Sequence, residues 1–205
     1  MCVGLGQVRG SRAPSRRKLE FIRAIPAKYV ILPFMKHRKL PHVDMDHHYQ
    51  FITFRTLESL DTYLAKIYDL DMPNSKKQMI VDLHLDSSTQ GAYLYGEQID
   101  IFKSVVLGRD GILYDLLAMA VMPNHVHLLL KQIESLSKII KYIKAKSAID
   151  LNKALNRNGQ FWAKDYYDRV IRNETHFETV YRYILDNPIK AHLPDAERRI
   201  YSVYE

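Results

Sequence analysis

Two histidines separated by one apolar residue are the side chains best placed to do chemistry in this chain. His125 and His127 flank Val126 within a run rich in β-forming residues, 121–130. Side chains two residues apart in a strand project from the same face of a sheet. Both imidazoles are therefore expected on one side, where two neutral nitrogens can bind one divalent ion. The pair alone is more often two partly buried histidines that bind nothing.

A tyrosine and an asparagine near the C-terminus form a second candidate group. Residues 174–187 have helical spacing, and Pro188 is expected to end that helix. Tyr183 and Asn187 are four residues apart, which places them about 40° apart around the helix axis. Asn187 would complete a nitrogen and oxygen ligand set that suits Mg²⁺ or Mn²⁺ better than a structural zinc. Tyr183 would then attack a phosphorus that the ion polarises, unless its ring is simply buried at a helix–sheet interface.

The elements that must position these residues predict a single α+β domain. Residues 113–122 and 125–131 are expected to pair as a hairpin, joined by the turn-forming residues Pro123 and Asn124. Residues 47–56 predict another strand. Strands that alternate with helices indicate helices packed against a sheet. Helical spacing occurs at residues 58–70, 76–86, 98–107 and 135–155, and Asn74 or Ser75 is the expected N-cap of the second of these helices. An aromatic loop is expected at residues 160–172.

Composition fits a globular protein of a reducing compartment. The chain has 205 residues, of which 47% are hydrophobic and 26% charged. Its single cysteine, Cys2, excludes an internal disulfide framework and a thiolate zinc cage, which favours the cytoplasm. No apolar stretch approaches the roughly 20 residues that span a membrane, so no membrane partner is expected.

The net charge of +7 favours a polyanionic partner such as nucleic acid. Residues 9–39 carry ten lysines and arginines but one acid, Glu20. This segment is either a basic arm that contacts nucleic acid or a leader without structure, and Met35 and Met45 are alternative start sites.

Four ordered blocks of the chain resemble one family. Residues 120–130 resemble the His-hydrophobic-His motif of the IS200/IS605-like single-tyrosine (HUH) transposases, and more closely that of their chromosomal relatives, the REP-associated tyrosine transposases. The resemblance continues through residues 48–55, 161–172 and 183–190. The expected organisation is a basic N-terminal extension over residues 1–42, the transposase domain over 43–193 and a C-terminal tail over 194–205.

The resemblance implies a ferredoxin-like (RRM-like) antiparallel sheet, the HUH endonuclease fold. It also implies cleavage and rejoining of single-stranded DNA beside hairpins through a 5′-phosphotyrosine. Carried over by position, His125, His127 and Asn187 match the family's metal ligands, with Mg²⁺ or Mn²⁺ as cofactor, and Tyr183 matches its nucleophile. Many insertion-sequence members have glutamine at the position of Asn187. Relatives act as domain-exchanged homodimers or as monomers, and both remain open for this chain.

Basic and aromatic side chains would handle the DNA. Arginines and lysines are expected on its backbone, and loop aromatics on unpaired bases. The alternatives are that the lysines form a solvated helix face and that Trp162 anchors the core. The candidate DNA-binding residues are Lys138, Lys141, Lys144, Lys146, Arg169 and Arg172, and the candidate stacking residues are Phe161, Trp162, Tyr166 and Tyr167.

Two other functions compete with a transposase. A domesticated protein that binds DNA hairpins without cleaving them would keep the basic charge but would not need Tyr183. A metal-dependent hydrolase of small phosphoesters would need the histidines but neither the basic charge nor the tyrosine.

Overall fold

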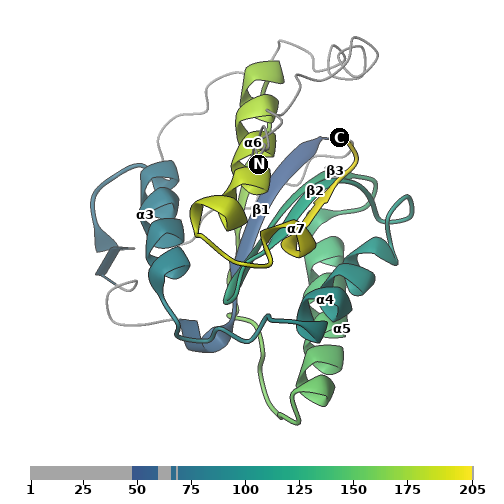
Figure 1. Ribbon diagram of the computed structural model, residues 1–205. Coiled ribbons are helices and arrows are strands. Elements are labelled where there is room, and N and C mark those ends of the chain that lie inside the picture. The colour runs from purple at the N-terminus through teal and green to yellow at the C-terminus, as the bar shows by residue number, and fades with distance from the viewer. Residues whose placement is uncertain (1–47, 60–65, 68, 205) are drawn as a thin grey trace, which may run out of the picture.

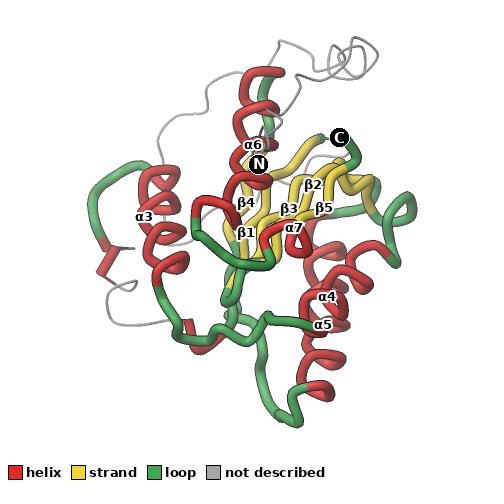
Figure 2. The backbone as a smooth tube through the Cα atoms, viewed as in Figure 1, coloured by secondary structure: helices red, strands yellow, loops and turns green. Residues whose placement is uncertain are grey.

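A central antiparallel sheet positions the two histidines. The computed structural model describes residues 48–59, 66–67 and 69–204; the N-terminal extension expected over residues 1–42 lies outside this part. The strand order is β4-β1-β3-β2-β5 (Figure 2). The strands are β1 (Tyr49–Arg55), β2 (Tyr114–Val121), β3 (His125–Gln132), β4 (Tyr167–Val170) and β5 (Ile200–Ser202).

Helices cover both sides of the sheet. Two helices, α4 and α5, lie together on one side, whereas α6 and α3 lie on the other (Figure 1). None of the helices in the described ranges is long and apolar enough to cross a membrane. The architecture is the α+β arrangement that the sequence predicts. The helices are η1 (Leu57–Ser59, a 3-10 helix), α3 (Asn74–Ser87), α4 (Glu97–Leu107), α5 (Leu136–Ala154), α6 (Glu174–Lys190) and α7 (Ala196–Arg199).

Strand β3 divides the interior into two cores because successive side chains point to opposite faces. Val126 and Leu128 pack in the same cluster as Ile139 of α5. Leu129 packs in a separate cluster with Ile184 of α6. The histidines of β3 share the parity of Leu129, so they point towards α6, on the side away from α5.

A β-bulge in β2 keeps small residues beneath α6. The pairing with β3 shifts between Leu116 and Ala118, so Leu117 is the extra residue. The bulge reverses the inward and outward alternation, and Ala118 therefore joins the α6 core while Leu116 joins the α5 core. Beyond the bulge, Ala120 pairs with His127. Its methyl side chain leaves room for α6 to approach the imidazole.

Several predicted element boundaries were wrong. Residues 160–172 are not only a loop, because they include β4, an edge strand paired with β1. Helix α6 continues through Pro188 to Lys190, since a proline in the last turn forfeits only one backbone hydrogen bond. Helix α3 begins after Pro73 without a side-chain cap, although Asn74 or Ser75 was the expected cap. Residues after 193 contribute α7 and β5, which the sequence pattern did not indicate.

The tryptophan of the 160–172 segment anchors the core. Trp162 is 3% exposed, and its indole donates a hydrogen bond to the Ser147 hydroxyl at 2.9 Å. Its ring packs edge-on against Phe54 at 4.8 Å and Phe161 at 4.9 Å. Phe161 is also buried. The prediction that these two residues stack on DNA bases is therefore wrong, and the alternative of a core anchor is confirmed for Trp162.

Candidate active site

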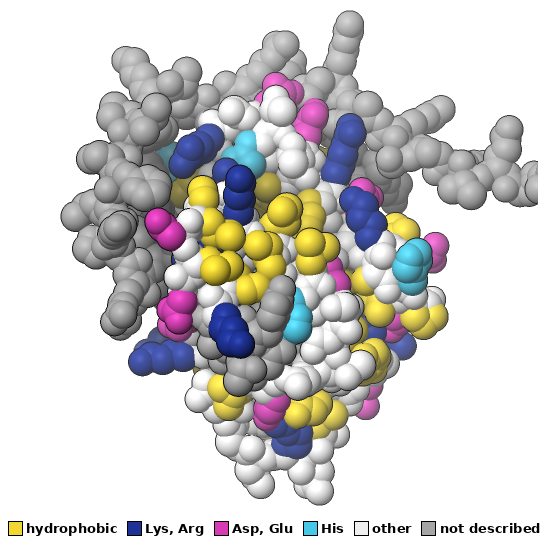
Figure 3. Space-filling model, turned by 90° about the vertical axis from the view of Figure 1, so that its left-hand side faces the viewer, with side chains coloured by type: hydrophobic (Ala, Val, Ile, Leu, Met, Phe, Trp, Pro, Cys, Tyr) yellow, Lys and Arg dark blue, Asp and Glu magenta, His cyan; other side chains and the backbone are white. Residues whose placement is uncertain are grey.

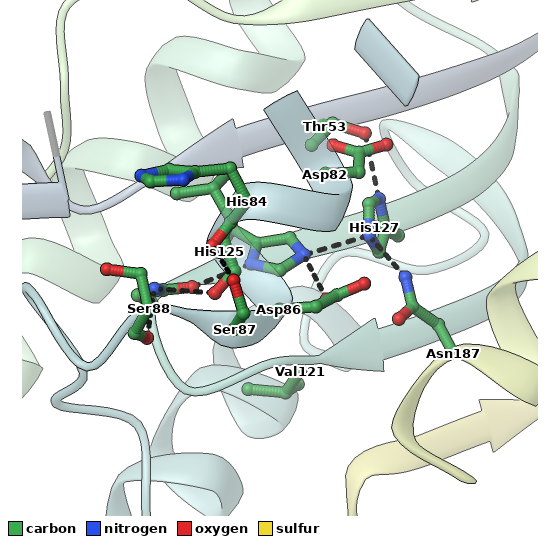
Figure 4. Close-up of polar contacts among 12 residues, drawn as sticks. Thr53, Asp82, His84, Asp86, Ser87, Ser88, Val121, His125, His127 and Asn187 are labelled. Carbon is green, nitrogen blue, oxygen red and sulfur yellow. Dashed lines mark hydrogen bonds and ion pairs between the residues drawn. The ribbon is translucent and has the colours of Figure 1, made fainter. Parts of the chain in front are cut away.

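The two imidazoles of β3 face one another. His125 and His127 are fully buried, and their Nε2 atoms lie 3.1 Å apart (Figure 4). Burial lowers the pKa of His125 well below its usual value, and the neighbouring His127 and Arg55 lower it further. Burial lowers the pKa of His127 to about 3. Both rings are therefore neutral at physiological pH, the form that binds metals.

The turn residue Asn124 fixes which nitrogen of His125 carries the proton. Its side-chain amide donates to the carbonyl oxygens of Leu85 and Ser88, both at 3.0 Å, and to that of Gln90 at 3.4 Å. This leaves the Asn124 oxygen facing His125 Nδ1 at 2.8 Å. Nδ1 must donate there, so the lone pair is on Nε2.

The second histidine has a partner that accepts either tautomer. The Thr53 hydroxyl lies 2.8 Å from His127 Nδ1 and can donate to it or accept from it. When Nδ1 carries the proton, His127 Nε2 is free to bind a metal beside His125 Nε2. Partners of this kind orient metal-binding imidazoles.

We expect Asn124→Ala to lower the free energy of unfolding by about 3 kcal/mol. The substitution leaves buried carbonyl oxygens at the end of α3, and the Nδ1 proton of His125, without their hydrogen-bond partner. Thermal or denaturant unfolding measures this loss. The matched control is Asn152→Ala, which removes a hydrogen bond to Gly159 O at an exposed position and should cost less than about 1 kcal/mol. Equal effects of the two substitutions would show that Asn124 is not a structural link.

Helix α6 brings Tyr183 and Asn187 to the histidines. The Tyr183 ring packs edge-on against His127, with ring centres 5.2 Å apart. The amide of Asn187, 3% exposed, lies 2.9 Å from His127 Nε2. When the amide oxygen of Asn187 faces His127, it also accepts a hydrogen bond from the Tyr183 hydroxyl at 3.3 Å. The amide nitrogen then donates to Asp86 at 3.3 Å. The two residues therefore share one face of the helix, as their spacing predicts.

Two carboxylates of α3 complete the site, and sequence reasoning missed both. Asp82 is buried and accepts hydrogen bonds from the Tyr183 hydroxyl at 2.8 Å and from Gln78 at 2.6 Å. Asp86 lies 3.6 Å from His125 Nε2. The four-residue spacing of Gln78, Asp82 and Asp86 puts them on one face of a helix. That polar stripe on a predicted helix was the available signal.

Burial raises the pKa values of the acidic groups in the site. It raises the pKa of Asp82 to about 7, against the lowering effect of the hydrogen bonds from Tyr183 and Gln78. Burial also raises the pKa of Asp86 to about 6. The pKa of the Tyr183 phenol is raised by burial first and by the adjacent Asp82 second. The phenol is thus fully protonated in this arrangement and needs activation before it can attack.

The donor atoms suit a divalent cation. One ligand atom from each of Asp82, His125 and His127 lies within 4.8 Å of the other two. Two ligands bound at right angles to a Mg²⁺-sized ion are about 3 Å apart, which is close to the 3.1 Å between the two Nε2 atoms. The residues present therefore fit a metal with mixed nitrogen and oxygen coordination.

The lysines expected on DNA lie on the other side of the sheet. Helix α5 packs on the face opposite the histidines (Figure 1). Lys138 and Lys146 pair with acids one turn away, Glu134 at 2.9 Å and Asp150 at 2.7 Å. Lys144 donates to the carbonyl of Ala163 at 2.6 Å. Lys141, also on α5, is exposed.

Arg55 and Arg169, by contrast, lie on the same face as the histidines. Arg169 of β4 pairs with Phe51, whose ring stacks on His127 with centres 5.7 Å apart. Arg169 and Arg172 are exposed. Arg55 pairs with His125 across β1 and β3, and sequence reasoning missed it. Of the expected stacking residues, Tyr167 is half-buried against Phe51 and Tyr166 packs at the α5 core.

Comparison with known proteins identifies the family that this geometry resembles. Residues 108–187, which contain both histidines and Tyr183 and end at Asn187, match the family model described as "Transposase IS200 like". The resemblance to IS200-like transposases is thereby confirmed. A comparison with curated proteins finds no match.

Two solved structures are similar to this chain. A REP-associated tyrosine transposase bound to a REP hairpin is 15% identical, with a TM-score of 0.50 over 74% of this chain and 73% of the other. A candidate transposase from Deinococcus radiodurans is 18% identical, with a TM-score of 0.40 over 75% of this chain and 98% of the other. The first of these confirms the predicted fold class, an antiparallel sheet with packed helices as in HUH endonucleases.

Proposed function

We propose that this protein cleaves and rejoins single-stranded DNA, with Tyr183 as the nucleophile. The observation that carries the proposal is the convergence of Tyr183 and Asn187 of α6 on His127 of β3, with the Tyr183 ring 5.2 Å from the imidazole and the Asn187 amide 2.9 Å from its Nε2. A hydrolase of small phosphoesters would not require a tyrosine hydroxyl at this point.

The chemistry is a transesterification, which conserves the number of phosphoester bonds. The Tyr183 oxygen attacks the scissile phosphorus, a new oxygen–phosphorus bond forms, and the bond from phosphorus to the 3′ oxygen breaks. The phenol loses one proton and the departing 3′ oxygen gains one, so protons balance. Because the phosphotyrosine retains the ester bond, another 3′-hydroxyl can reverse the step and join a different strand.

His125, His127 and Asn187 would hold the cofactor, for which we propose Mg²⁺ or Mn²⁺. When bound, such an ion polarises the non-bridging oxygens of the phosphate and stabilises charge in the transition state. Asn124 and Thr53 hold the imidazoles for this task, since a side-chain oxygen of each lies 2.8 Å from an Nδ1 atom. Phe51 and the Tyr183 ring cover His127 and limit the access of water.

The proposed substrate is single-stranded DNA beside a hairpin, by analogy with the structural neighbour bound to a REP hairpin. Seen from the side of α3 (Figure 3), lysine and arginine side chains border a group of apolar side chains, a surface that suits phosphates and bases together. We place this activity in the cytoplasm. A homodimer that exchanges α6 and a monomer that keeps it are both compatible with the site.

We expect the double variant Arg169→Gln/Arg172→Gln to bind a hairpin oligonucleotide about tenfold more weakly than the wild type, because both side chains are exposed and Arg169 lies on the face of the histidines. The slope of binding against salt should fall by about one for each phosphate that the variant no longer neutralises. Filter binding or fluorescence anisotropy at several salt concentrations measures both.

The matched control for these arginines is Lys138→Gln/Lys141→Gln on α5, which removes the same charge from the opposite face. Affinity should change by less than about twofold. A larger decrease in the lysine variant would place the DNA on the α5 face instead.

The function is tested by incubating the protein with a labelled single-stranded oligonucleotide that contains a hairpin, in Mg²⁺ or Mn²⁺. A transesterase gives a protein–DNA adduct that survives denaturing electrophoresis. The second candidate, a non-cleaving hairpin-binding protein, gives binding with no adduct in either metal.

A further inference from the structure

We infer that Asp82 of α3 is a further metal ligand and that the same carboxylate positions the hydroxyl of Tyr183. The inference rests on the proposed function and deepens it, because it joins the ion and the nucleophile through one side chain. It gives helix α3 a role in the reaction.

The geometry favours Asp82 over its neighbour on the helix. A carboxylate oxygen of Asp82 lies within 4.8 Å of ligand nitrogens of both His125 and His127. Asp86 instead faces His125 at 3.6 Å and accepts from the Asn187 amide at 3.3 Å. Asp86 therefore orients Asn187 and His125, whereas Asp82 reaches the space that the two imidazoles share.

Hydrogen-bond donors and a second carboxylate surround the buried Asp82 carboxyl. Among the described residues, the groups that act on the buried Asp82 carboxyl are Tyr183, Gln78, Asp86 and Tyr167, and none of them is a cation. Arg55 is the described cation that acts on His125. A buried carboxylate in a protein takes up a proton, pairs with a positive group or coordinates a metal. Two neutral imidazoles cannot supply a positive charge, but an ion between them and Asp82 can.

The hydrogen bonds of Asp82 leave it able to bind an ion and hold the tyrosine together. One carboxylate oxygen accepts from Tyr183 at 2.8 Å and the other from Gln78 at 2.6 Å. Each oxygen of a carboxylate has two acceptor sites, so one remains available on each. The carboxylate would thus set the position of the phenol oxygen relative to the ion. Asp82 is in this sense a ligand for the metal and a positioning residue for Tyr183.

The test is a titration of the full-length protein with Mn²⁺ alone, followed by calorimetry or by the decrease of the free Mn²⁺ resonance signal. We expect Asp82→Asn to weaken Mn²⁺ binding at least about tenfold, because the substitution removes the anionic ligand and preserves its shape. Asp86→Asn should weaken binding less than Asp82→Asn. Asp150→Asn, on α5 and paired with Lys146, should leave Mn²⁺ affinity unchanged.

Further variants keep the outcome interpretable. Thermal unfolding of Asp82→Asn checks that the fold persists, since asparagine can still bond with Gln78 and Tyr183. Tyr183→Phe should bind Mn²⁺ within about threefold of the wild type, because every ligand is retained.

The inference is overturned if Asp82→Asn binds Mn²⁺ as tightly as the wild type, if Asp86→Asn is the weaker binder, or if the wild type binds no Mn²⁺. Formation of the DNA adduct by the wild type together with any of these results rejects only the role of Asp82. Binding of Mn²⁺ that depends on Asp82 but is accompanied by no adduct rejects the proposed function and leaves the metal site standing.

Discussion

Replacing Tyr183 with phenylalanine is expected to abolish the covalent attachment of DNA and to lower strand cleavage by more than about 10³-fold. The substitution removes the only atom that forms the new bond to phosphorus and keeps the ring that packs against His127 and Phe51. Stability and hairpin binding should therefore stay close to wild type. Denaturing electrophoresis with a labelled oligonucleotide measures the adduct and the cleaved strand together.

The matched control is Tyr181→Phe, two residues away on the same helix. The Tyr181 hydroxyl bonds with Ser202 of the edge strand β5 and with the carbonyl of Tyr204 at 2.9 Å. Its removal should affect stability but leave the yield of adduct intact. A Tyr183→Phe variant that still forms the adduct would assign the nucleophile to another tyrosine.

Replacing His127 with leucine is expected to lower cleavage by about 10²–10³-fold and to remove its dependence on Mg²⁺ or Mn²⁺. His127 lies between His125 Nε2 at 3.1 Å and the Asn187 amide at 2.9 Å, so its removal opens the centre of the ligand set. Leucine has a similar volume, and replacing a buried polar group by an apolar one of similar shape costs little stability. Cleavage measured over a range of metal concentrations, with hairpin binding measured in parallel, separates a defect in chemistry from a defect in DNA binding.

His84→Ala serves as the control for the histidine variant, because His84 is a partly exposed residue of α3 that points away from the His127 ring in Figure 4. Cleavage by this variant should match the wild type. If His127→Leu cleaved at the wild-type rate with unchanged metal dependence, the histidine pair would be structural, which is the alternative that the pair alone left open.

The sequence predicts the elements of the site whose spacing is local. The i, i+2 histidines of β3 and the i, i+4 pair Tyr183 and Asn187 each follow from the period of one element. That these two groups meet follows from the pairing of strands and the packing of α6, and only the resemblance to a family anticipated it.

The contribution of α3 could not be read from the sequence. Asp82 and Asp86 belong to a helix that reaches the site by tertiary packing, and solvent-facing acids have the same spacing on many helices. The lysines that were expected to bind DNA illustrate the converse. A helical stripe of lysines shows which face of α5 is polar, but not on which side of the sheet that helix packs.

The most direct measurement of the central claim is the identity of the residue that carries DNA after cleavage. Trypsin cuts after Arg182 and Lys190, and the resulting peptide, residues 183–190, contains Tyr183 as its only tyrosine. After nuclease digestion of the adduct, tandem mass spectrometry should find a nucleotide on this peptide, linked to the Tyr183 oxygen. A nucleotide on a peptide with Tyr181, Tyr166 or Tyr167, or on no peptide at all, would contradict the assignment of Tyr183 as the nucleophile.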